Sequence, residues 1–208
     1  MAEFRTARGL DRLVNFSDAA VAIAITLLIL PLVDIASQIE RHTLGYVLAH
    51  NVGTVTGFVV TFAVIGRFWM VHHEVFEWVA DYDYQLAWVN MLWLFSIVFL
   101  PFAANLLSHV NGQSSAVFGL YVGTMVVASG SLTLMEWMLT RRPELMRPEV
   151  RGKVDLLRSM VPTALLVVAL ILAVLVPSVG LFWLLLLFGA SPIEQLVRKV
   201  LPERTDAV

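Results

Sequence analysis

The sequence contains no cysteine among its 208 residues. Disulfide bonds, thiolate metal sites and a cysteine nucleophile are therefore excluded. Charged residues are also scarce, at 14% of the chain, and the formal net charge of −2 gives no basis for expecting a nucleic-acid partner. Hydrophobic residues make up 59% of the chain, and the mean hydropathy is +0.80. This composition is typical of an integral membrane protein, with the lipid bilayer as its surroundings.

Several motifs of transport proteins are also missing. The sequence has no T-V-G-Y-G segment, which forms the carbonyl-lined filter of common potassium channels. The apolar segment 116–139 has no regular series of arginines, which a voltage sensor would need. No glycine-rich phosphate loop precedes a helix, so nucleotide-driven transport has no support.

Long apolar runs recur along the whole chain and leave no room for a soluble domain. We predict an all-helical transmembrane bundle that forms a single domain over residues 1–208, with six spans of about 20 residues or more. The expected helices cover about 10–33, 44–73, 84–107, 116–139, 156–176 and 180–200. The purely apolar part of the last one is short.

Lysine and arginine residues gather on one side of this topology. With six spans, both termini and the basic connection 140–153 lie on the same side, and the opposite side holds only Arg41. Basic loops face the cytoplasm in membrane proteins. We therefore expect a multi-pass protein of the cell inner (plasma) membrane with both termini in the cytoplasm.

The first apolar run opens with charged and polar residues, among them Arg12, Ser17 and Asp18. Charged groups at membrane depth are costly and usually face a protein interior or a water path. This pattern favours a helix that lines an ion pathway. Two alternatives fit the same residues. One is an ordinary helix N-cap at Asn15 or Ser17, with Asp18 favoured by the helix dipole in the first turn. The other is a secretory signal peptide, which Asp18 and Pro31 fit poorly.

A narrow stripe follows on the same helix. At about 3.6 residues per turn, one face of it presents Ile23, Thr26, Leu27 and Leu30. By spacing alone, such a stripe is typical of packing between helices. Thr26 is its only hydroxyl, and a Thr hydroxyl in a helix can bond to the carbonyl three or four residues back.

One group of potential metal ligands occurs, formed by His72, His73, Glu74 and Glu77. His73 and Glu77 are four residues apart and share a helix face, as metal ligands often do. No third ligand is evident and no H-E-x-x-H motif is present, so we expect neither a metal site nor an enzyme. The alternative role is that of a neutral imidazole bonded to buried polar groups.

The motif R-x-x-x-F-S-D at positions 12–18 resembles the signature of the endosomal and lysosomal potassium channel family, which has bacterial members. The pattern W-x-x-H-H-x-x-F at 69–76, and Asn90 followed by L-P-F at 100–102, resemble the second and third helices of bacterial members. The resemblance covers the first half of the chain. From Gly112 onward only the hydropathy agrees.

This resemblance implies a channel that conducts potassium ions passively, without a cofactor, through a pore lined by the first helix. The apolar constrictions of family members would correspond to Ile23, Leu27 and Leu30, with Thr26 assisting selectivity. Animal members carry two copies of the signature per chain and pair as dimers. A single copy therefore implies a homotetramer around the pore.

The resemblance also implies a polar network beneath the first helix. Trp69 and His73 on the second helix, with Asn90 on the third, would meet Ser17 and Asp18. The signature itself also includes Arg12 and Phe16. The two adjacent histidines both remain candidates for the inward position, and we favour His73.

Two other functions remain compatible with the sequence. A small proton-coupled secondary transporter could use Asp18 and His73 as a relay. Such a transporter usually has a broken helix at the midplane, whereas the first helix is predicted to be unbroken. A structural membrane scaffold is the other candidate, and it leaves Arg12 and Asp18 unexplained.

Overall fold

The computed structural model describes residues 7–40, 42–109 and 114–200. Apart from an isolated bridge between Val79 and Met146, the regular structure of these residues is helical. The α-helices are α1 (Ala7–Leu27), α2 (Leu30–Ala36), α3 (Leu44–His50), α4 (Val52–Glu77), α5 (Tyr84–His109), α6 (Ser115–Arg141), α7 (Leu157–Leu175) and α8 (Ala190–Val200). The 3-10 helices are η1 (Ser37–Glu40), η2 (Pro143–Leu145), η3 (Pro148–Val150) and η4 (Pro177–Gly189).

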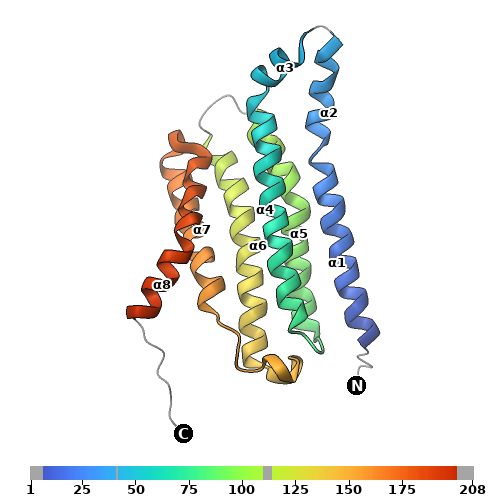
Figure 1. Cartoon of the computed structure of the whole chain (residues 1–208), viewed down its shortest axis with the longest axis vertical. Helices are drawn as coiled ribbons and strands as arrows, with labels where there is room; N and C mark the ends of the chain where they lie inside the picture. The colour runs from blue at the N-terminus through green and yellow to red at the C-terminus, as the bar shows by residue number, and fades with distance from the viewer. Residues whose placement is uncertain (1–6, 41, 110–113, 201–208) are drawn as a thin grey trace.

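The helices run up and down along one long axis (Figure 1). α1 and α2 form one edge of the bundle, and α7 and α8 lie at the opposite edge. In the middle, α6 packs against both α5 and α7, while α1 packs against α5 and α4. The first helix is therefore covered by its own chain on one side only.

Five helical segments in the described ranges are long and apolar enough to cross a membrane. They are Arg8–Glu40, Val52–Glu77, Tyr84–Leu107, Ser115–Arg141 and Leu157–Leu175. The prediction of an all-helical, multi-pass membrane protein is thus confirmed. After α7, the chain returns beside that helix as η4, which has 13 residues.

The first predicted helix, 10–33, is broken. α1 ends at Leu27 and α2 begins at Leu30. Between them, the amides of Leu28 and Ile29 each bond at 3.3 Å to the carbonyl three residues back instead of four. Pro31 explains the break, because it has no N–H to donate to the Leu27 carbonyl. The prediction of an unbroken first helix was wrong, although α2 continues in the general direction of α1 (Figure 1).

Two further predicted helices are also divided. The second, 44–73, separates into α3 and α4 at Asn51, whose side-chain amide donates to the Val47 carbonyl at 2.8 Å and to Gln38 at 3.0 Å. The last, 180–200, consists of η4 and then α8. Pro192 lies in the first turn of α8, where its missing N–H is tolerated and where a proline is typical of the start of an α-helix.

The loops at the lower end of Figure 1 are bonded to each other. Arg142 pairs with Asp83 and contacts Gln85. The amide of Arg147 donates to the Trp78 carbonyl at 2.9 Å. The same end holds the start of α1 and the basic loops after α6. No lysine or arginine lies at the upper end among the described residues, and Arg41 falls outside them.

Candidate functional site: the first helix and the polar network beneath it

α1 has a buried face that packs on the bundle. Ser17, Val21, Ala24 and Leu28 follow one another at intervals of three or four residues, and each is at most 5% exposed. This spacing is that of one face of an α-helix. The buried face of α1 therefore begins with the serine of the signature.

The opposite face of α1 and α2 is exposed and mostly apolar. Ile23 is 60% exposed, Leu27 42% and Leu30 53%, and Thr26 also lies on this face. Leu27 and Leu30 also border a small cavity beside α4 and α5, but a large part of each of these residues is open in the described part of the chain. An exposed apolar surface of this kind indicates contact with another protein chain or with lipid.

Beneath α1, a buried chain of hydrogen bonds joins three helices. The amide Nδ2 of Asn90 on α5 donates to Ser17 Oγ at 3.0 Å, and Ser17 Oγ donates to the Leu13 carbonyl at 2.9 Å. His72 Nε2 on α4 lies 2.7 Å from Asn90 Oδ1. Ser17, His72 and Asn90 are all 0% exposed.

The direction of these bonds assigns the tautomer of His72. Asn90 Oδ1 can only accept a hydrogen bond, so His72 Nε2 must carry the proton that lies between them. The other ring nitrogen, Nδ1, is buried and has no partner among the described residues. An imidazole bonded to a buried amide therefore joins α4 to α5, and Asn90 joins both helices to α1.

The imidazole that meets Asn90 is that of His72, and the preference for His73 was wrong. The His73 side chain is 52% exposed and lies 4.0 Å from Glu77. The periodicity of α4 explains the assignment: Ile65, Phe68 and His72 follow one another at three- and four-residue steps on its buried face. Comparing the two histidines with these apolar neighbours would have identified the inward one.

Asp18 has a separate partner. The indole Nε1 of Trp69 donates to Asp18 Oδ1 at 2.8 Å, so a second polar contact joins α1 to α4. His73 stacks on Trp69 with ring centroids 5.7 Å apart. Trp69 is thus the residue that contacts both Asp18 and His73.

Trp93 is a member of this site that the sequence reasoning missed. It lies on α5, is 0% exposed and stacks on His72 with centroids 3.8 Å apart and an interplanar angle of 12°. Its position three residues after Asn90 places it on the same face of the helix, which is a signal that the sequence contains. The stack holds the His72 ring in the plane that reaches Asn90.

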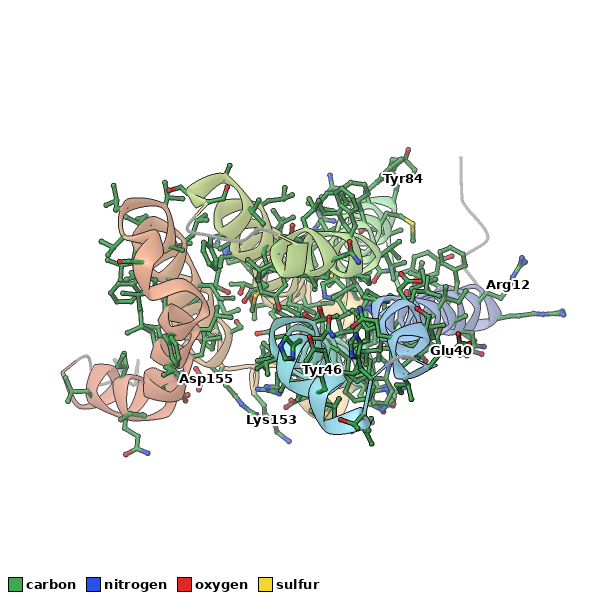
Figure 2. The ribbon with its side chains drawn as sticks, turned by 90° about the horizontal axis from the view of Figure 1, so that it is seen from above. Arg12, Glu40, Tyr46, Tyr84, Lys153 and Asp155 are labelled. Atoms are coloured by element: carbon green, nitrogen blue, oxygen red, sulfur yellow. The ribbon has the colours of Figure 1, made fainter. Side chains whose placement is uncertain are left out.

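Two signature residues lie outside this network. The Arg12 side chain extends outward from α1, away from the bundle (Figure 2), and it is exposed rather than buried as the sequence suggested. Phe16 is also 58% exposed. Within one chain, the two halves of the signature therefore face different surroundings: Ser17 and Asp18 bind the neighbouring helices, and Arg12 and Phe16 face outward.

Thr26 has the local hydrogen bond expected of a helical threonine. Its Oγ1 donates to the Ile23 carbonyl at 2.8 Å. The hydroxyl proton is thereby occupied, while the lone pairs of the oxygen remain able to accept. No group of three or more potential metal ligands occurs in the described ranges.

The fold and this site define a class of multi-pass helical membrane protein whose first helix is held on one face by a buried polar network. Comparisons with known proteins identify the family. The family model described as the endosomal/lysosomal potassium channel TMEM175 matches residues 12–101. A potassium channel of Streptomyces collinus is 34% identical over 145 residues, which are 67% of this chain and 68% of that protein.

Two further proteins agree with this assignment. A potassium channel of Chamaesiphon minutus is 31% identical over 124 residues, which cover 54% of this chain and 57% of that one. The crystal structure of a lysosomal potassium-selective channel TMEM175 homolog from Chamaesiphon minutus has a TM-score of 0.61 at 22% identity and covers 95% of this chain and 98% of its own. This structure shares the fold.

The chain belongs to the TMEM175 family of endosomal/lysosomal potassium channels. The family and these relatives are ion channels and not enzymes, so the expectation that this chain is not an enzyme is confirmed. This assignment also confirms the resemblance of the sequence to the endosomal and lysosomal potassium channel family.

Proposed function

We propose that this protein is a passive potassium-permeable channel whose pore is lined by α1 and α2. The observation that carries the proposal is the exposed apolar face at Ile23, Leu27 and Leu30, in a chain whose family consists of potassium channels. That face is opposite the buried network, so the network holds the helix with this face directed away from its own subunit. No cofactor is needed for passive conduction.

Four chains would surround the pore axis. The signature occurs once in the chain, and the α1 edge of the bundle offers each copy a free face for its neighbours. In a homotetramer, the outward positions of Arg12 and Phe16 would lie at contacts between subunits. This arrangement gives the outward half of the signature a role that a single chain does not provide.

In the membrane, we propose six spans with both termini in the cytoplasm. η4 would be the sixth, since a 3-10 helix rises about 2 Å per residue and is longer than an α-helix of equal residue number. The basic residues gather at the end where α1 begins, and basic loops face the cytoplasm. The membrane would accordingly be the inner (plasma) membrane.

Within the pore, each position has a distinct role. A ring of Ile23 side chains would form the apolar constriction, which can close by dewetting. Leu27 and Leu30 would form further apolar contacts along the axis. Between Ile23 and Leu30, Thr26 would present hydroxyl oxygens, and its bond to the Ile23 carbonyl leaves the lone pairs free to face an ion.

The break at Leu28 and Ile29 favours a second candidate, a proton-coupled secondary transporter using Asp18 and His73. Broken helices often form substrate sites in such transporters. Against it, Asp18 is bonded to Trp69, and His73 is half exposed beside Glu77. Trp69 contacts both residues, and its indole cannot pass a proton between them as a carboxyl or imidazole could, so a proton relay lacks a geometric basis.

Ion flux separates the two functions. Purified protein in liposomes should dissipate a potassium gradient with no nucleotide and no second ion, and planar bilayers should show discrete current steps. Ile23→Trp should block the pore and abolish potassium flux. Val168→Trp, at an exposed position of α7, should leave the flux unchanged. Flux that strictly requires a proton gradient would support the transporter instead.

A further inference from the structure

A large cavity lies between α4, α6, α7 and η4, away from the exposed face of α1. Its volume is about 800 Å³. The upper part is apolar, with walls that include Val60, Met125, Leu166 and Leu184. At its margin, Val59 is 57% exposed and Leu185 56%, so the cavity opens sideways toward the surroundings of the bundle.

The lower part of the same cavity is lined by charged side chains of both signs. They are Arg67, Lys153, Arg158, Glu74, Glu136 and Asp155. Arg158 on α7 donates to Glu74 on α4 at 3.0 Å, which joins the two helices across the lower end. Lys153 and Asp155 lie between the α7 side and the α3 side of the molecule when it is viewed from above (Figure 2).

Glu136 is the buried acid of this cavity. Its side chain projects from α6, is only 4% exposed, and lies near Ser159 and near the ion pair of Glu74 and Arg158. The neighbouring hydroxyls bond to one another, with Thr163 2.7 Å from Ser129 and 2.9 Å from Thr133. A buried acidic side chain that lines a cavity, beside an arginine already paired with another glutamate, is a good site for a group that donates charge-assisted hydrogen bonds.

Arg67 supplies the opposite charge. It lines the cavity from α4 and takes part in none of the ion pairs found among the described residues. Arginine binds phosphate oxygens through two parallel N–H groups. Basic pockets between transmembrane helices on the cytoplasmic side bind lipid headgroups. Arg67 lies ten residues before the end of α4, which is about 15 Å along the helix and leaves room for a headgroup beneath it.

We propose that this cavity binds a phospholipid with a primary ammonium headgroup. The ammonium lies against Glu136, the phosphate lies between Arg67 and Lys153, and an acyl chain fills the apolar upper part and leaves through the side opening. Because the cavity has both acidic and basic side chains, it favours a headgroup that carries both an ammonium and a phosphate. An anionic headgroup without an amine would bring its charge toward Glu136, and a quaternary choline has no N–H to donate.

Native mass spectrometry of the delipidated full-length protein tests the proposal. The protein is titrated separately with phosphatidylethanolamine, phosphatidylcholine and phosphatidylglycerol. We expect saturable binding of one phosphatidylethanolamine per chain, with an affinity about tenfold above phosphatidylcholine, the value of one charge-assisted hydrogen bond. Glu136→Gln should abolish the preference for phosphatidylethanolamine. Arg67→Gln should lower the affinity for all three lipids by about tenfold.

Matched controls use charges outside the cavity. Glu149→Gln and Arg8→Gln, both at exposed positions, should leave lipid binding unchanged. Equal binding of the three lipids, or an unaltered preference in Glu136→Gln, would overturn the proposal. If Glu136→Gln does not fold, Glu136→Asp, which keeps the acid on a shorter side chain, should reduce the preference for phosphatidylethanolamine, and an unaltered preference in that variant would overturn the proposal. The Arg67→Cys variant tests a different occupant. If the protein without lipid forms an oligomer in which this thiol is protected from a thiol reagent, a second copy of the chain occupies the cavity, and this result would also overturn the proposal.

Discussion

The orientation of the first helix depends on a few buried hydrogen bonds. Ser17, Asn90 and His72 form one chain of donors and acceptors, and Trp69 holds Asp18 separately. A buried polar group without a partner costs about 1–3 kcal/mol. The loss of one member therefore also leaves its neighbour unpaired, so these residues determine which face of α1 is turned away from the bundle.

The two adjacent histidines should differ sharply when replaced. His72→Ala removes a ring that stacks on Trp93 and leaves Asn90 Oδ1 unpaired, so we expect a loss of about 2–4 kcal/mol in unfolding free energy. His73→Ala, at a half-exposed position, should change it by less than about 1 kcal/mol. Thermal unfolding of the two variants in the same detergent measures the difference, and equal losses would contradict the assigned roles.

Ile23 should control basal conduction. Four apolar side chains on an axis exclude water, so Ile23→Asn should hydrate the constriction and raise the open probability. Single-channel recording at fixed voltage measures this effect. The matched control is Val168→Asn on α7, which is exposed on another helix and should leave the current unchanged. An unaltered current in Ile23→Asn would move the constriction to Leu27 or Leu30.

Thr26 should contribute modest selectivity. Thr26→Val keeps the shape and removes the hydroxyl, so the permeability ratio of potassium to sodium should fall about two- to tenfold, the range of one neutral hydrogen bond. Thr26→Ser retains the oxygen and should preserve the ratio. Reversal potentials under bi-ionic conditions measure both variants. If Val and Ser behave alike, the hydroxyl serves only its bond to the Ile23 carbonyl.

Helix periodicity predicted the α-helices in the middle of the chain closely, because α5, α6 and α7 are continuous apolar segments with clear polar ends. It failed where one residue interrupts the backbone bonds. Pro31 breaks the first helix within an apolar run, and Asn51 divides the second through its own side-chain amide. In the site, the motif identified Ser17, Asp18, Trp69 and Asn90. The choice between adjacent histidines depended on which face of α4 is buried, a property of the packed bundle.

The break between α1 and α2 should respond to one substitution. Pro31→Ala restores an N–H that can bond to the Leu27 carbonyl, so the two helices should join. We expect slower amide hydrogen exchange at Ile29 and Leu30, with α5 amides as the internal reference. A small cavity beside the break, lined by Leu28, Pro31 and Pro101, leaves space for this movement. Unchanged exchange would mean that packing, and not Pro31, maintains the break.

In residues 7–40, 42–109 and 114–200, the apolar stripe of α1 and α2 stays largely exposed, and assembly is a process that can cover it. α1 lies at the margin of the bundle, with the buried network on one side and the apolar stripe on the other (Figure 1). A monomer would expose the stripe to lipid, whereas a tetramer would place four copies around an axis. The two states differ in the distance between equivalent residues of neighbouring chains.

The absence of cysteine makes this distance measurable with a single substitution. Leu30→Cys introduces the only thiol of the chain, at a position that is 53% exposed on the stripe. A disulfide forms only when the two Cα atoms approach within about 7 Å. If the stripe lines a narrow axis, mild oxidation in the membrane should convert most of the protein into covalent dimers, because each cysteine can pair with only one neighbour in a tetramer.

Leu175→Cys, 71% exposed at the end of α7 and at the opposite edge of the bundle, should remain monomeric under the same conditions. Reduction should restore the monomer and the original current in Leu30→Cys. Cross-linking that is equal at both positions would indicate random collision, and its absence at Leu30 would mean that the stripe faces lipid.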